Sequence, residues 1–147
     1  MRTNLHLTLI ATALLAWPSC DRPRALAAGQ ARVIELTADK DSRYRQARTV
    51  APTITAVAGE PLILRITATK AREVARDGSV HGLALLDGNS DTVPGWRFFL
   101  HPGTQDLAVN APAKPGRYTA VCIIICSEGH EDMTFTLLVT EPGKTKE

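Results

Sequence analysis

Short apolar segments with strand-like alternation recur along this chain, and glycine or proline stands between most of them. This pattern constrains the fold more than any other feature, because strands of about four to eight residues bounded by turn residues are typical of antiparallel β-structure. We expect strands at 32–38, 53–57, 62–69, 80–86, 96–100, 106–109, 118–125 and 133–140. About eight short strands predict an all-β fold, a β-sandwich with Greek-key connections.

The segments between these strands are expected to be irregular. Residues 39–48 are polar and charged, which is typical of a solvated loop, with an interaction surface as the alternative, and we assign no chemistry to them. Residues 70–78 favour a short helical turn that ends at Asp77-Gly78. The aromatic side chains of Trp96 and Phe98 are expected in the core.

The N-terminal residues are typical of a secretory signal. Arg2 precedes the apolar run 5–17, which is too short to span a bilayer. Ala27 ends a small-x-small triplet, so we interpret 1–27 as a signal peptide and predict export to the periplasm or envelope. The alternative is that Cys20 becomes a lipid-modified N-terminus, which would be the expected route to a membrane.

Length and composition fit a single domain with one core. We expect a domain at 31–141 and a polar tail at 142–147. The chain has 17 basic and 15 acidic residues, of which the signal contains three arginines and one aspartate, so 14 of each remain. A nearly neutral domain lacks the charge signature of nucleic-acid binding or of attachment to a membrane surface.

Soft metal ligands gather in the stretch V-C-I-I-I-C-S-E-G-H-E-D-M at 121–133. Cys122 and Cys126 are four residues apart, His130 follows four residues later, and Met133 three after that. Thiolate together with thioether indicates copper. The same spacing could line one face of a buried helix, but β-branched residues before the second cysteine favour a strand that ends in a loop.

Other uses of the two cysteines are open at this point. In an exported protein Cys122 and Cys126 could form a disulfide, and both could hold zinc together with His130 and an upstream histidine. Neither alternative gives a role to Met133, the only methionine outside the signal.

The number of metal ions is a separate question. Cys126, His130 and Met133 with a distant His81 already satisfy the ligand pattern of a mononuclear blue-copper site. Cys122 is then a second thiolate, which could bridge two ions with the first and let them share one electron. Such sharing lowers the rearrangement that electron transfer requires, so it suits an electron relay better than bond-making chemistry.

Two histidines compete to be the upstream ligand. His81 stands at the start of the apolar strand 80–86, where a sheet would hold its backbone. His101 precedes Pro102-Gly103, where a turn is expected and a ring would point to water. We therefore expect His81 to be the ligand.

The pattern C-x3-C-x3-H-x2-M, preceded by V-H-G-L-A-L and K-P-G-R-Y, resembles the binuclear copper (CuA) domain of cytochrome c oxidase subunit II and nitrous oxide reductase. The similarity extends over about 53–140. The resemblance implies a cupredoxin fold and a centre with two coppers. It also implies a set of ligands: bridging Cys122 and Cys126, capping His81 and His130, weakly bound Met133, and the backbone carbonyl of Ile124.

The chain departs from that family at three points. Ser127 follows the second cysteine, where the family usually has glycine. The interval from His81 to Cys122 is longer than usual, so we expect an enlarged loop near 87–96. The transmembrane helices of subunit II have no counterpart in this sequence, so the chain resembles a free-standing relative.

These features predict a periplasmic electron carrier that is not itself an enzyme, with a cytochrome, an oxidase or a reductase as its redox partner and no nucleic-acid partner. One alternative is a mononuclear blue-copper carrier. The other is a copper-delivery protein for an oxidase under assembly, which would release copper readily, whereas a carrier keeps it through many redox cycles.

Overall fold

A computed structural model describes residues 30–143 of the chain. The expected signal peptide 1–27, with Cys20, and most of the polar tail lie outside the described residues. Over the range 30–143, no helix is both long and apolar enough to cross a membrane.

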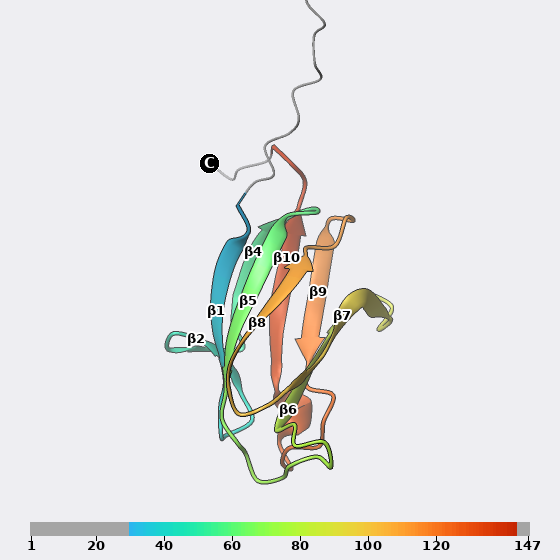
Figure 1. Cartoon of the computed structure of the whole chain (residues 1–147). Coiled ribbons are helices and arrows are strands. Elements are labelled where there is room, and N and C mark those ends of the chain that lie inside the picture. The colour runs from blue at the N-terminus through green and yellow to red at the C-terminus, as the bar shows by residue number, and fades with distance from the viewer. Residues whose placement is uncertain (1–29, 144–147) are drawn as a thin grey trace, which may run out of the picture.

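The first of two β-sheets has five strands in the order β3-β2-β1-β5-β8 (Figure 1). Strand β1 runs parallel to β5, and its other neighbour β2 is antiparallel. The strands are β1 (Arg32–Ala38), β2 (Tyr44–Gln46), β3 (Thr49–Val50), β5 (Pro61–Ala68) and β8 (Gly103–Asn110).

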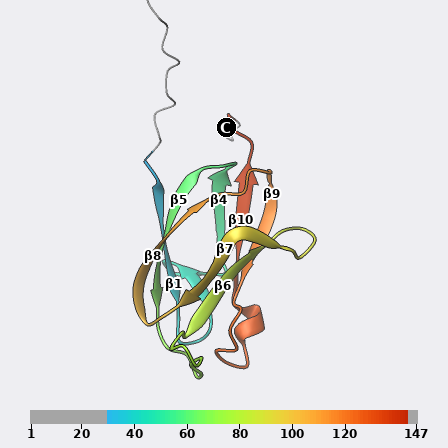
Figure 2. The same ribbon diagram turned by 45° about the vertical axis from the view of Figure 1, so that its right-hand side comes forward.

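The second sheet has the order β4-β10-β9-β6-β7 (Figure 2). Strand β6 lies between β9 and β7 and is antiparallel to both. The strands are β4 (Thr53–Val57), β6 (His81–Leu86), β7 (Thr92–Leu100), β9 (Gly116–Val121) and β10 (Thr134–Thr140).

The core lies between the two sheets and follows from period-two alternation. In β5 the buried residues are Leu62, Leu64, Ile66 and Ala68, and in β10 they are Phe135, Leu137 and Val139. Each large apolar side chain stabilises the fold by about 1.5–3 kcal/mol when buried. The ring of Tyr44 from the first sheet packs edge-on against Phe135 of the second, with ring centroids 5.3 Å apart.

The predicted all-β sandwich is confirmed, with ten strands in residues 30–143 rather than about eight. Trp96 is buried in the core and Phe98 packs against it, as predicted. The segment 70–78 is irregular with one turn at 76–77, instead of the expected helical turn. Strand β9 ends at Val121, so the prediction of a strand to residue 125 was wrong by four residues.

The prediction of an enlarged loop at 87–96 was also wrong. The Asp87 carboxylate accepts the backbone N–H groups of Asn89 and Asp91, which closes a tight turn. Strand β7 then begins at Thr92, so half of the segment belongs to the sheet. The reason is local, because an aspartate side chain that caps its own turn needs few residues to reverse the chain.

The largest correction concerns residues 39–48, which were expected to be a solvated loop. They include β2, and the side chains of Ser42 and Tyr44 are fully buried. Arg43 and Arg45, which stand between and after them, stay partly exposed. The charged residues at alternate positions gave the segment the composition of a solvated loop, although Ser42 and Tyr44 face inward.

Candidate metal centre

Segments far apart in the sequence meet at the end of the sandwich that lies lowest in Figure 1. They are the turn after β1, the segment after β5, the start of β6, and the loop 122–133 that joins β9 to β10, here called the ligand loop. Backbone hydrogen bonds join the segment after β5 to the ligand loop. The N–H groups of Arg72 and Glu73 both donate to the carbonyl of Cys126, at 3.1 and 2.9 Å. The second cysteine is therefore held from outside its own loop.

His81 is the first residue of β6 and is fully buried. Its Nε2–H donates to the carbonyl oxygen of Thr69 at 2.8 Å. Among the described residues, Nδ1 of His81 is the one buried side-chain nitrogen or oxygen without a hydrogen-bond partner. Burial lowers the pKa of His81, so the ring stays neutral with a lone pair on Nδ1. A neutral imidazole with one free nitrogen is what a metal ion requires.

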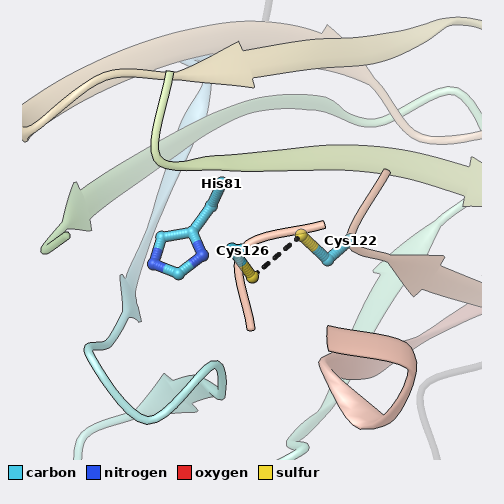
Figure 3. Close-up of side chains that lie close together, drawn as sticks. All are labelled: His81, Cys122 and Cys126. Carbon is cyan, nitrogen blue, oxygen red and sulfur yellow. Dashed lines mark hydrogen bonds between the residues drawn. The ribbon is translucent and has the colours of Figure 1, made fainter. Parts of the chain in front are cut away.

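Cys122 and Cys126 are both buried and unpaired, and their sulfur atoms lie 3.8 Å apart. This separation is far beyond the disulfide bond length of about 2.05 Å. A ring nitrogen of His81 and the two sulfur atoms all lie within 4.8 Å of one another. Figure 3 shows the three side chains reaching into the same space, one from β6 and two from the ligand loop.

The surroundings of Cys122 keep its thiol neutral when no metal is bound. Burial raises the pKa of Cys122 to about 11. The thiol donates to the carbonyl oxygen of Ile124 at 3.3 Å, and the N–H of Gly82 donates to its sulfur at 3.5 Å. The Ile124 carbonyl thus lies beside the sulfur of Cys122, and its role as a ligand stays a prediction.

His130 begins a short 3-10 helix, His130–Asp132, and is only partly buried. Its Nδ1–H donates to the carbonyl of Ser127 at 3.0 Å, which leaves Nε2 as its free nitrogen. The ring lines a surface hollow of about 480 Å³ that also contacts Arg72 and Ile125. His130 does not join the group formed by His81 and the two cysteines, so its expected role as a ligand stays a prediction.

Met133 is fully buried at the end of the ligand loop. Its carbonyl accepts the backbone N–H of Cys122 at 3.1 Å, and its own N–H donates to the carbonyl of His130. These bonds place the backbone of Met133 directly against that of the first cysteine. Its role as a weak ligand also stays a prediction.

His101 is exposed and lies just after β7. Its backbone N–H donates to the side chain of Gln105, within the turn that was predicted for this segment. His81, and not His101, is therefore the histidine that the fold brings to the two cysteines.

Sequence reasoning missed the importance of Gly82. A Cβ at this position would lie 2.6 Å from Cγ1 of Ile123, closer than real Cβ contacts allow. Glycine therefore lets the ligand loop approach β6 next to His81. One glycine inside an apolar strand was the available signal, since such a residue often marks close backbone approach.

Sequence reasoning also missed Ser42 and Tyr44. The hydroxyl of Ser42 lies 3.4 Å from the sulfur of Cys126, and the hydroxyl of Tyr44 donates to the carbonyl of Gly82. The available signal was one aromatic residue inside a charged segment.

No protein-family model and no curated protein sequence matches the chain. Among solved structures, reduced auracyanin from Roseiflexus castenholzii is similar with a TM-score of 0.51 and 18% identity, covering 76% of this chain and 99% of that chain. Auracyanin A, a blue copper protein from Chloroflexus aurantiacus, has a TM-score of 0.51 and 16% identity, covering 76% of this chain and 100% of that chain.

The periplasmic domain of cytochrome oxidase subunit II from Bradyrhizobium japonicum is similar with a TM-score of 0.45 and 15% identity, covering 78% of this chain and 88% of that chain. At such identities a likeness concerns the fold alone, and the two auracyanins carry that conclusion. The implied fold is confirmed, and the chain is a cupredoxin by fold.

Proposed function

We propose that this chain is a copper-binding electron carrier whose centre holds two coppers between Cys122 and Cys126. The observation that carries the proposal is the group of one free imidazole nitrogen and two unpaired sulfur atoms, all within 4.8 Å of one another. Soft thiolates beside an imidazole favour copper, while the buried thiols have no disulfide to explain them.

The distance between the sulfur atoms supports a shared ion. Metal–sulfur bonds are about 2.3 Å long in zinc sites, so two sulfur atoms on one ion can be at most about twice that distance apart. The 3.8 Å separation lies inside this limit. Both thiolates can therefore reach a common ion without backbone movement, and they would act as bridges if a second ion bound to the same two sulfur atoms.

The remaining ligands complete the proposal. His81 offers Nδ1, and the buried Met133 and the Ile124 carbonyl stand beside Cys122. His130 is proposed as the second histidine, through a movement of its ring toward the cysteines. With both cysteines as shared ligands, a pair of coppers would supply one shared electron that moves with little rearrangement.

Burial of the donor atoms favours electron transfer over catalysis. His81 and Cys126 are fully buried and Cys122 is nearly so, so a substrate has no direct approach to them. Electron transfer needs no such contact, and the partly exposed His130 gives a short route to the surface. We propose a cytochrome, an oxidase or a reductase in the periplasm or envelope as the redox partner.

The decisive measurement is the copper content of the exported form after reconstitution, together with its EPR spectrum. Two coppers per chain and hyperfine splitting from two equivalent nuclei are expected. One copper per chain with four-line splitting would show that the centre is mononuclear and not binuclear. A colourless protein that takes only zinc would contradict the proposal altogether. Slow loss of copper to a chelator would separate a carrier from a copper-delivery protein.

A further inference from the structure

Ser42 lies 84 residues before Cys126, yet its hydroxyl is at the sulfur. The Oγ–Sγ distance is 3.4 Å, within the range for a hydrogen bond to sulfur. The same hydroxyl lies 2.6 Å from the hydroxyl of Ser127. Ser42 is fully buried, although serine is mostly an exposed residue. Because both groups are buried, the hydroxyl of Ser42 does not serve solubility, and its contact with the sulfur of Cys126 suggests another role.

The turn after β1 holds Ser42 in place at some cost to its backbone. Its φ is +55°, in the left-handed region that residues other than glycine rarely adopt. The Asp39 carboxylate accepts the N–H groups of Asp41 and Arg43, and the Asp39 carbonyl accepts that of Ser42. Strained conformations of this kind persist where the surrounding structure enforces them, and they gather at functional sites.

The guanidinium group of Arg43 fastens this turn to the ligand loop. It donates to the carbonyl oxygen of Ser42 at 3.1 Å and to that of Gly129 at 3.3 Å. The two segments are therefore joined both by a side-chain bridge and by the contact between the serine hydroxyls.

The donor and the acceptor of each hydrogen bond follow from which groups carry a proton. The N–H of Gly129 donates to the oxygen of Ser127 at 3.2 Å. A metal-bound thiolate has no proton and only accepts, so the hydroxyl of Ser42 donates to the sulfur of Cys126. The hydroxyl of Ser127 then donates to the oxygen of Ser42. All three bonds point toward the sulfur, and aligned bonds of this kind strengthen one another.

We propose that Ser42 and Ser127 form a hydroxyl relay that donates to the sulfur of Cys126 and raises the reduction potential of the copper centre. The inference rests on the proposed function. A donor at a metal-bound sulfur stabilises the state with more negative charge, which is the reduced one, and hydrogen bonds to sulfur ligands are known to tune potentials. Ser127 stands where the resembled family usually has glycine, and in this arrangement its hydroxyl donates to that of Ser42.

The relay acts on one sulfur only. Cys126 accepts from a hydroxyl, whereas the sulfur of Cys122 is approached by the backbone N–H of Gly82 at 3.5 Å. The two bridging sulfurs therefore have different donors. Ser42 and Ser127 are positioning residues, because they act through Cys126.

The test compares the reduction potentials of copper-loaded variants. Ser42→Ala and Ser42→Gly both remove the hydroxyl, but glycine adopts the positive φ without strain, whereas alanine adopts it at a cost, as Ala47 and Ala51 do. The two variants should differ in stability and yet share one lowered potential. A roughly tenfold change in the redox equilibrium corresponds to 59 mV for one electron. The sulfur-to-copper charge-transfer band should move in both.

A matched control and a double variant sharpen the comparison. Ser79 is also fully buried, but its hydroxyl donates to Asp77 instead of a sulfur. Ser79→Ala should keep the wild-type potential. Ser127→Ala should lower the potential less than Ser42→Ala, and the double variant should match Ser42→Ala alone, because the relay acts through Ser42.

The outcomes distinguish the relay from the proposed function. A wild-type protein that binds no copper overturns both. Copper binding with an unchanged potential in both Ser42 variants overturns the relay alone. An equal fall in Ser79→Ala, or potentials that follow the stability of Ser42→Ala and Ser42→Gly, would also overturn the relay, because a general loosening of the site would then explain the shift.

Discussion

The Nε2–H of His81 donates to the carbonyl of Thr69 at 2.8 Å, and this one bond determines which nitrogen the ring can offer. Thr69 directly follows β5 in the first sheet, while His81 begins β6 in the second. The bond therefore crosses between the sheets and leaves Nδ1 without a partner beside the two cysteines. Such a bond to the far nitrogen is typical of histidines that bind metals.

His81→Ala is expected to abolish or severely disturb the native copper spectrum, because it removes the only imidazole in the buried group of described residues. His101→Ala is the control and should leave the spectrum nearly unchanged, since that ring is exposed. Visible absorption and EPR of both variants check this. Equal tolerance of the two changes would show that His81 is not the upstream ligand.

Cys122→Ser is expected to reduce the copper content from two per chain to one. Cys126, His130, Met133 and His81 remain, and they form the ligand pattern of a mononuclear site. Metal analysis with EPR should find the splitting of a single nucleus. Retention of two strongly coupled coppers would mean that Cys122 is not a bridge.

Met133→Leu is expected to keep both coppers but shift the reduction potential. The side chain is fully buried, and a swap of similar volume costs less than about 1.5 kcal/mol. A weak thioether ligand tunes a centre more than it binds the metal. Potentiometry together with metal analysis tests this, and complete loss of copper would make Met133 essential for binding.

Gly82→Ala is expected to destabilise the protein by about 1–3 kcal/mol, the usual cost of overpacking a core. The added methyl group would lie 2.6 Å from Ile123. Gly88→Ala is a matched control, because Gly88 is exposed and a Cβ there would meet nothing within 4 Å. Denaturant unfolding of the metal-free proteins measures both, and equal stabilities would refute the close approach.

The metal-free protein should lose stability between about pH 9 and pH 11. The Cys122 thiol ionises near 9 when unfolded, whereas burial raises its folded pKa to about 11. The unfolded state therefore releases its proton first, so the stabilisation is complete below pH 9 and declines as the pH rises. Two pKa units correspond to about 2–3 kcal/mol. The difference between wild type and Cys122→Ser, followed by denaturant unfolding against pH, isolates this contribution.

Local sequence was sufficient for the elements whose neighbours are close in the chain. The alternation predicted strands at 62–69 and 133–140, where the structure has β5 and β10, because side chains of a strand point to opposite faces with a period of two. The spacing of Cys122 and Cys126 likewise predicted two thiols near each other, and the structure has their sulfur atoms 3.8 Å apart. The resemblance added the cupredoxin fold.

The contacts that complete the site join residues far apart in the chain, and only the tertiary structure decided them. Ser42 reaches Cys126 across 84 residues, and Thr69 orients His81 from the other sheet. The residues next to Ser42 and Thr69 in the sequence do not indicate these partners. Ser42, for example, stands in a charged segment that is typical of a loop. Hydrogen bonds of this kind depend on which strand ends meet in space, and strand order is set by packing of the whole core. The sequence alone therefore indicated the candidate ligands, whereas their hydrogen-bond partners followed from how the two sheets pack.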